Sequence, residues 1–407
     1  MTKKIGILFI AAATIAFMTL SGCGGGGSPS ASGTGGANSV TFSGVAAKGP
    51  INGGDVKVYG LKNGQLDTTT VLGTGKTATD GSGSYTVTLA SPPAGPVVVE
   101  VSGGTYTDES SGTAGVVLKT PLRAVVSSVA EGAKIAVTPL THLAFEQVDG
   151  IGTYTAVEID DSNAQIANFF KISDIIKSLP FDPTKDVPSG SSNDQKLYSA
   201  ALGVFSQLVN DDRAKRGNTQ SLDDALGTLL LAFETELETN GGFTQATLGT
   251  INDAITNFEK TGKNKTGIIP APIVFNSGVL QLITVGTLPP NTIINGIDCT
   301  ITLPAGVTVK ADPATGETLA GVVDPVSLAA TNSFASGNYD KTAGTLHIAV
   351  ANVQPGFAIG EFAHIEFDGY PVGSASFTVK VNRIDGGSGI TSAPLSGITI
   401  RNTFAGL

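Results

Sequence analysis

The spacing of apolar residues changes twice along this chain, and this constrains its fold more than any other feature. From Val40 to about Val137, and again beyond about Ile268, apolar and polar residues alternate, which predicts strands with two distinct faces. Between these segments the apolar period lengthens to that of a helix. We therefore expect a multidomain chain with a small β-sandwich over 40–137, an α-helical domain over 138–267 and a β-sandwich or jelly roll over 268–407.

The first residues have the order of an export signal. Lys3 and Lys4 precede an apolar run from Ile5 to Leu20, which is too short and too weakly flanked to span a bilayer. The run ends in Leu20-Ser21-Gly22-Cys23. This segment resembles the lipobox of bacterial lipoprotein precursors, which implies cleavage between Gly22 and Cys23, loss of residues 1–22 as a signal peptide, and lipidation of Cys23. An ordinary secretory signal with an incidental cysteine is the alternative.

The residues after Cys23 bear on where such an anchor would lie. In the lipoproteins that the chain resembles, an aspartate after the cysteine marks retention in the inner membrane, and here that position is Gly24. The resemblance therefore implies an outer-membrane lipoprotein, on the periplasmic or the cell-surface side. Residues 23–39 are mostly Gly, Ser, Ala, Thr and Pro, a composition that predicts a flexible linker.

The charge balance narrows the class of partner. The chain has 24 Lys and Arg against 34 Asp and Glu, a net charge of −10, whereas binding phosphates requires clustered basic residues. We therefore expect no nucleic-acid partner. Charged residues make up only 14% of the chain, below the typical ~25%, and the 53 glycines favour strands and turns.

The first β segment has strands that alternate in polarity, separated by glycine-rich turns. One run, 97–101, is almost continuously apolar. The segment resembles carboxypeptidase-regulatory-like and related surface-protein repeats, which act as spacers or interaction modules without catalytic residues. The residues that carry the resemblance are Ser43-Gly44-Val45, Asp55-Val56-Lys57-Val58-Tyr59 and Thr79-Asp80-Gly81-Ser82-Gly83-Ser84-Tyr85.

The middle segment predicts four or five helices around one apolar core. Ser221 and Asp224 have the spacing of an N-terminal cap, and Gly241 and Gly262 are expected terminators. His142, near the start of the segment, is expected to be a packed or capping histidine, because a single imidazole without neighbouring ligands makes no site.

The last segment resembles the cohesin and carbohydrate-binding-module superfamily of bacterial surface proteins. That resemblance implies a cohesin-like β-sandwich that binds a protein domain or a polysaccharide. Glycan binding usually relies on exposed aromatic rings, and the chain has no Trp, so Tyr339, Phe357 and Tyr370 are the candidate platform. The residues that carry the resemblance are Leu303-Pro304-Ala305-Gly306-Val307-Thr308-Val309, Gly360-Glu361-Phe362-Ala363-His364-Ile365-Glu366-Phe367 and Phe377-Thr378-Val379-Lys380-Val381-Asn382.

Two histidines lie on predicted strands of this last segment. Alternation directs His347 and His364 away from the core, and Glu366 shares the outward face of His364. If the two strands were neighbours, His347, His364 and Glu366 could converge on a metal ion. The alternative is that all three are solvated face residues.

Few residues in the chain could carry catalysis. There is no Cys-x-x-Cys-His, His-Glu-x-x-His or Gly-x-Ser-x-Gly motif, and Cys299 is expected to be buried as a small apolar side chain. Asp108 and Glu109 could bind Ca²⁺, but without an Asp-x-Asp-x-Asp-Gly spacing they are better explained as turn-capping acids. We expect no cofactor and no enzymatic activity.

These observations lead to one expected function and two alternatives. The expectation is a non-catalytic binding or scaffold protein, anchored to the membrane through its N-terminal lipid, that holds a protein partner at the cell surface. The first alternative is a polysaccharide-binding lipoprotein. The second is a glycan hydrolase built from carboxylates, which would need two acids facing each other across a cleft.

Overall fold

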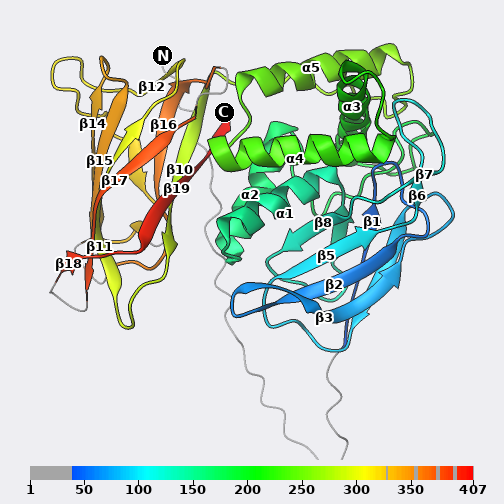
Figure 1. Ribbon diagram of the computed structural model, residues 1–407, viewed down its shortest axis with the longest axis horizontal. Helices are drawn as coiled ribbons and strands as arrows, with labels where there is room; N and C mark the ends of the chain where they lie inside the picture. The colour runs from blue at the N-terminus through cyan, green and yellow to red at the C-terminus, as the bar shows by residue number, and fades with distance from the viewer. Residues whose placement is uncertain (1–38, 327–328, 353–355, 373–375, 388–391, 407) are drawn as a thin grey trace, which may run out of the picture. The chain divides into compact units, whose positions relative to one another are not determined.

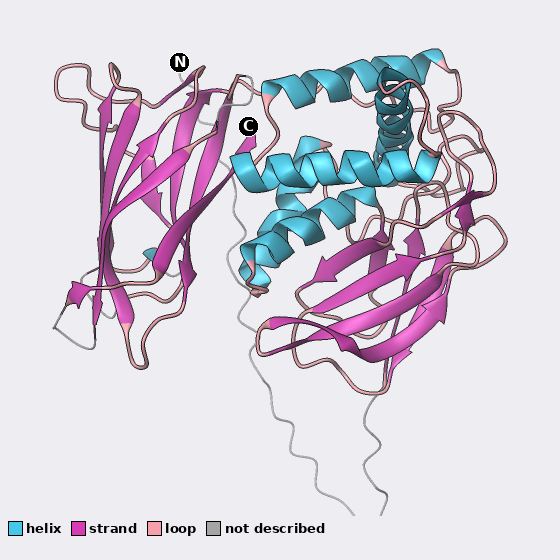
Figure 2. Ribbon diagram, viewed as in Figure 1, coloured by secondary structure: helices cyan, strands magenta, loops and turns pink. Residues whose placement is uncertain are grey.

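The computed structural model places strands and helices in the order that the apolar spacing predicts (Figures 1 and 2). It describes residues 39–326, 329–352, 356–372, 376–387 and 392–406. These residues belong to a compact unit that runs from Asn38 to Leu407. The described chain is mostly β-sheet with five helices, so the expectation of a β-rich protein with a helical middle is confirmed.

The first β segment forms two sheets that share a core. One sheet has the strand order β4-β1-β9 and the other β3-β2-β5-β8, and a short pair, β6-β7, lies beside them. Phe42 of β1 and Val58 of β2 both point into the common core. The strands are β1 (Val40–Ala46), β2 (Asp55–Lys62), β3 (Gln65–Lys76), β4 (Ser84–Leu89), β5 (Val97–Ser102), β6 (Thr105–Tyr106), β7 (Val116–Val117), β8 (Leu122–Val126) and β9 (Lys134–Val137).

The pairing of β1 with β9 is parallel, whereas the other pairs of this segment are antiparallel. This pairing places β9 beside β1, and the first helix begins two residues after β9 ends, at Pro139. Among the described strands of this segment, only β1 and β9 run parallel.

The nearly continuous apolar run in β5 has a structural cause. Val97, Val99 and Val101 face the interior of the sandwich, whereas Val98 joins a second cluster with residues of α1 (Pro139–Ile151). Because α1 packs against the outer face of this sheet at Val98, both faces of β5 are largely buried, and Glu100 on that face is paired with Arg123.

The helices begin at side-chain caps. Thr138 accepts hydrogen bonds from the Leu140 and Thr141 amides at the start of α1. Ser221 caps α4 (Leu222–Asn240) through the Asp224 amide, and α4 ends at Gly241 with φ 77°, so both predicted signals are confirmed. The remaining helices are α2 (Ala156–Phe169), α3 (Asn193–Lys215) and α5 (Gln245–Lys260).

The last segment forms two five-stranded sheets. One has the order β12-β16-β10-β19, with β13 also paired to β16, and the other has the order β14-β15-β11-β17-β18. Their inward residues meet in the same apolar core. The strands are β10 (Ser277–Gly286), β11 (Ile293–Thr302), β12 (Val307–Thr308), β13 (Val323–Pro325), β14 (Ser333–Asp340), β15 (Thr345–Asn352), β16 (Gly360–Gly369), β17 (Thr378–Gly387), β18 (Ala393–Pro394) and β19 (Ile398–Gly406).

Aromatic side chains continue the core from the helices into the last sheets. The ring of Phe243, between α4 and α5, lies 4.8 Å from that of Phe169 in α2, and Phe169 lies 6.1 Å from Phe275. Phe275 in turn packs 5.2 Å from Tyr370, and the Phe404 amide of β19 donates a 2.8 Å hydrogen bond to the Gly241 carbonyl. The helices and the last sheets therefore share buried contacts.

Candidate functional site

The predicted anchor lies outside the described residues. Gly22 and Cys23 belong to the stretch before residue 39, so cleavage and lipidation there stay predictions. Within the described part, the structure contains no helix long and apolar enough to cross a bilayer.

The two histidines lie on different sheets, so the condition for a shared metal site, that their strands are neighbours, is not met. His347 is on β15 and His364 is on β16, and these consecutive strands pair with different partners. His347 Nε2 lies 2.8 Å from Asp298 Oδ1, and His364 Nε2 lies 2.5 Å from Glu361 Oε1. Glu366 shares β16 with His364 and is exposed. Among the described residues no three His, Cys, Asp or Glu side chains are placed to hold a metal ion.

The predicted aromatic platform is also not formed. Phe357 and Tyr370 are buried, at 3% and 5% exposure, and only Tyr339 of the three is half-buried. Phe357 stacks against Phe362, and the Tyr370 hydroxyl donates a 3.0 Å hydrogen bond to the Phe243 carbonyl. Both rings are therefore part of the core and are not available at the surface to stack on a sugar ring.

A hollow of about 700 Å³ lies beside Tyr339. Its lining comes from residues 308–316, Leu319 and residues 338–342. The Asp312 carboxylate accepts hydrogen bonds from the Ala314 and Thr315 amides, and these bonds lower the pKa of Asp312. This acid therefore caps a turn at the rim of the hollow.

Cys299 is buried in β11, as its alternation predicts. Burial raises the pKa of its thiol to about 12, so the reactive thiolate is scarce near neutral pH. His142 is likewise packed, because it is 8% exposed and stacks on Phe145, and burial lowers its pKa to about 3.

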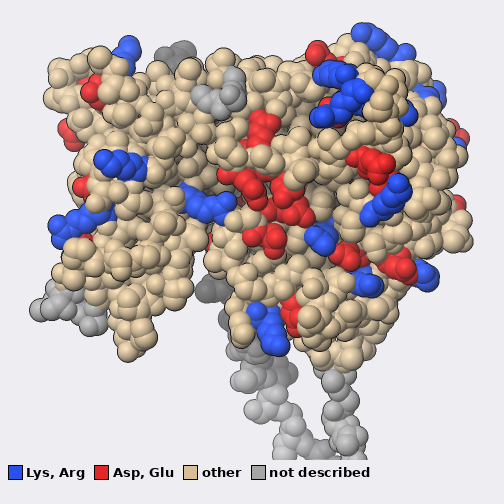
Figure 3. Space-filling model, viewed as in Figure 1, with Lys and Arg blue, Asp and Glu red and all other residues tan. Residues whose placement is uncertain are grey.

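Acidic side chains gather over α1 and α4 (Figure 3). Glu146 and Asp149 come from α1, and Glu234 and Glu238 come from α4. Burial and then the nearby charge of Glu234 raise the pKa of Glu146 to about 7, while Arg123 opposes that shift. The arrangement is a mutually repelling acidic face, and by itself it defines no ligand.

The most unusual polar site is a buried lysine between two acids. Lys48, which follows β1, is fully buried, and its Nζ lies 3.0 Å from Asp108 Oδ2 and 3.6 Å from Glu109 Oε2. Ser206 of α3 accepts a 2.6 Å hydrogen bond from Lys48 Nζ and donates one to Glu109. A fully buried, unpaired lysine would be strongly unfavourable, so these contacts account for its presence in the core.

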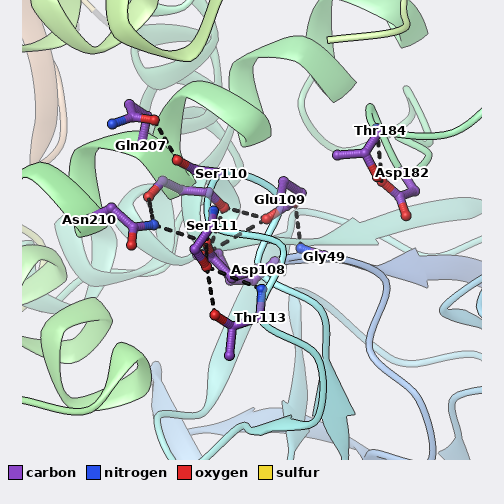
Figure 4. A network of polar contacts seen from close by, with 12 residues as sticks. Gly49, Asp108, Glu109, Ser110, Ser111, Thr113, Asp182, Thr184, Gln207 and Asn210 are labelled. Carbon is purple, nitrogen blue, oxygen red and sulfur yellow. Dashed lines mark hydrogen bonds and ion pairs between the residues drawn. The ribbon is translucent and has the colours of Figure 1, made fainter. Parts of the chain in front are cut away.

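Hydrogen bonds on every side fix the two acids. Asp108 Oδ1 accepts from the Ser111 amide at 2.8 Å and from Asn210 Nδ2 of α3 at 2.9 Å. Glu109 Oε1 accepts from the Gly49 amide at 2.5 Å (Figure 4). The capping role expected of Asp108 is therefore correct for its contact with Ser111, whereas its contact with Lys48 was not foreseen.

The backbone beside Lys48 leaves no room for a side chain. Gly49 has φ 63°, and a Cβ at that position would lie 2.1 Å from the Thr107 carbonyl oxygen. Only glycine fits this conformation and this close approach. The segment after β1 is thus held against the loop that carries Asp108 and Glu109. Lys48 also lies 5.1 Å from the centre of the Tyr106 ring.

The pKa values of Lys48, Asp108 and Glu109 are shifted in different directions from their usual values. Burial favours the neutral amine of Lys48, but the charges of Asp108 and Glu109 outweigh it and hold the Lys48 pKa above its usual value. Burial likewise opposes ionisation of Asp108, but Lys48 and the Ser111 hydrogen bonds lower the Asp108 pKa to about 2. The pKa of Glu109 is raised, chiefly through burial. The ion pair is therefore Lys48–Asp108, and Glu109 is the carboxylate that takes a proton most readily.

A second titratable cluster joins α2 to β16. Burial, followed by the charge of Glu361, raises the pKa of Asp161 to about 7. Burial works against protonation of His364, but Glu361 outweighs it, with Asp161 and Asp324 adding to its effect, and the His364 pKa is raised.

Asp108 and Glu109 were interpreted from the sequence as turn-capping acids, and their contact with Lys48 was not predicted. A signal was present, because Lys48 interrupts a run of small and apolar residues, Val45-Ala46-Ala47, before Gly49-Pro50. Its partners lie 60 and 158 residues further along the chain, so no local pattern could pair them.

Comparison with known proteins identifies no relative. No family model matches the chain, and neither a curated protein nor a solved structure matches it.

Proposed function

We propose that the chain is a non-catalytic lipoprotein of the outer membrane, anchored through Cys23, whose folded part holds a protein partner at the cell envelope. The carboxypeptidase-regulatory-like and cohesin-like resemblances of the two β segments motivate this assignment. The cohesin-like type itself is part of the proposal, and the β-rich architecture supports it.

The single observation that carries the protein-binding role is the edge strand β14. β14 is the first strand of its sheet, and residues 316–318 cover the outer side of its second half through the contacts of Gly316 with Tyr339 and Thr318 with Gly337. No described strand pairs with the outer side of its first half, 333–336. Phe334 stands there with 68% of its surface exposed. Main-chain pairing with a partner strand, supplemented by an aromatic anchor, is a common mode of protein recognition.

The side chains with catalytic potential are engaged in structural contacts, which also supports a binding role. Cys299 and His142 are packed in the core, and His347 and His364 each contact a neighbouring acid. Asp312, at the hollow, has a lowered pKa, whereas a general acid for glycoside hydrolysis needs a raised one. The hydrolase alternative therefore has the weakest support.

The test is capture of a partner from envelope extract by the full-length chain. We expect wild type to retain a defined protein, and Phe334→Thr to retain far less of it. Leu231→Thr is the matched control, because Leu231 is 61% exposed on α4, away from the β14 edge. Equal retention by both variants, or capture of polysaccharide alone, would contradict the proposal.

A polysaccharide ligand is the second candidate, and the hollow beside Tyr339 favours it. Tyr339 is half-buried at this concave surface, where a sugar ring could stack on it. Affinity electrophoresis in gels containing envelope polysaccharide tests this reading. Slower migration of wild type, abolished by Tyr339→Ala and retained by Phe334→Thr, would support glycan binding over protein binding.

A further inference from the structure

Lys48 and Asp108 are held in contact where the first sandwich meets α3, away from solvent. Both side chains are 0% exposed, and their reacting groups lie 3.0 Å apart at Nζ and Oδ2. The two residues are 60 positions apart in the chain, at the end of β1 and just after β6. An amine and a carboxyl group in this position have the components of an amide bond.

We propose that Lys48 and Asp108 condense to form an intramolecular isopeptide bond, with Glu109 as the proton carrier. The bond would covalently join the segment after β1 to the loop after β6. This inference is independent of the proposed partner and of the anchor.

The chemistry balances without an external reactant. One proton leaves the Lys48 ammonium for an Asp108 oxygen, which gives a neutral amine and a carboxylic acid. The Nζ lone pair then attacks Asp108 Cγ, a second proton moves from nitrogen to the departing oxygen, and the Cγ–O bond breaks. The products are an amide and one molecule of water, with no change of oxidation state.

Burial favours this reaction in two ways. A charged pair is costly in a low-dielectric interior, and the amide removes both charges from it. Groups held in contact also react as though their local concentration were very high, with effective molarities of ~10⁵ M or more in well-oriented cases. The contacts from Ser206, Ser111 and Asn210 provide that orientation.

Glu109 is placed to move the protons. Its Oε2 lies 3.6 Å from Lys48 Nζ, and the Ser206 hydroxyl bridges the two groups by accepting from Nζ and donating to Glu109. The Gly49 amide fixes the other carboxylate oxygen. The raised pKa of Glu109 suits a group that accepts a proton from the amine and returns it to the departing oxygen.

The chain carries its own comparison pair. Lys76 Nζ and Asp55 Oδ1 also form an ion pair, at 2.5 Å, but their side chains are 68% and 58% exposed. Water solvates both charges there, and no second acid among the described residues contacts the pair in an ion pair or hydrogen bond. The same functional groups should therefore remain separate at this position.

The direct experiment is peptide mapping by mass spectrometry of the full-length chain purified from its host. We expect the peptides that contain Lys48 and Asp108 to be joined, with a mass lower than their sum by one water. Peptides containing Lys76 and Asp55 should be separate. Recovery of Lys48 and Asp108 in two unmodified linear peptides from folded protein would overturn the proposal.

Two conservative variants test the mechanism. Asp108→Asn should form the same amide by releasing ammonia in place of water, so its linked peptide should have the same mass as that of wild type. Glu109→Gln keeps the size of the side chain and should reduce the linked fraction at least tenfold, with folding checked by circular dichroism. Full linkage in Glu109→Gln would refute the role of Glu109, and a linked peptide of a different mass in Asp108→Asn would refute the bond itself.

Discussion

The Tyr370 hydroxyl donates a 3.0 Å hydrogen bond to the main-chain carbonyl of Phe243. This bond links the segment after β16 to the connection between α4 and α5. The ring is 5% exposed and packs 5.5 Å from Phe404. Tyr370 was a candidate for an aromatic binding surface, but its side chain is buried and connects a sheet to the helices.

Replacing Tyr370 by Phe should therefore destabilise the protein. The ring contacts remain, but the buried carbonyl of Phe243 loses its donor, which costs about 1–3 kcal/mol in the free energy of unfolding. Denaturant unfolding measures this change. Tyr339→Phe is the control and should change the stability by less than about 0.5 kcal/mol, because Tyr339 is half-buried at the surface. Equal effects of the two variants would show that the Tyr370 hydrogen bond contributes nothing specific.

The contribution of Asp161 to stability should fall as the pH rises from about 4 to about 7. The folded pKa of Asp161 is about 7 against an ordinary value of 3.8, so the folded state holds the proton more tightly than the unfolded state. This contribution is fully present below the unfolded pKa and is lost as the pH rises through the folded pKa. The raised pKa of His364 acts in the same direction, with its contribution lost at higher pH.

Asp161→Asn should flatten this profile. The variant keeps the shape of the protonated acid but cannot ionise, so it should be more stable than wild type at pH 8, by on the order of 2 kcal/mol after allowing for solvent screening. Unfolding curves at pH 5 and pH 8 provide the comparison. The exposed neighbour Asp160 is the control, and Asp160→Asn should change the slope far less, because its charge affects the Asp161 pKa less than burial and Glu361 do. An unaltered slope in Asp161→Asn would contradict the assignment.

The Cys299 thiol should resist labelling in the folded protein. Burial in β11 and a pKa raised to about 12 leave almost no accessible thiolate at pH 8. A chromogenic disulfide reagent should therefore react with Cys299 slowly in buffer and rapidly in denaturant. Rapid, complete reaction in buffer alone would show that β11 opens readily or that the thiol is accessible.

Local patterns predicted the elements of this fold well, and long-range partners poorly. Ser221 and Gly241 bound α4 because capping depends on residues within one turn, and Cys299 is buried because strand faces alternate. Whether the strands of His347 and His364 are neighbours could not be predicted, because the chain crosses between sheets from β15 to β16 and no local spacing encodes a crossover.

The buried charge network shows the same limit at the candidate site. Lys48 is stabilised only because Asp108 and Ser206 arrive from distant segments. Isolated in the sequence, a lysine next to glycine and proline indicates a solvated turn. The burial of Phe357 and Tyr370, which were candidates for a surface aromatic platform, also depends on which distant elements pack against them.

The proposed attachment of the folded part to the envelope depends on a lipid at Cys23. Mass spectrometry of the N-terminal peptide of the mature protein, extracted from the membrane fraction, is the decisive measurement. We expect a chain that starts at Cys23 and bears the added mass of acyl groups, and we expect a Cys23→Ser variant to leave the membrane fraction. An unmodified N-terminus, or one at another residue, would contradict it.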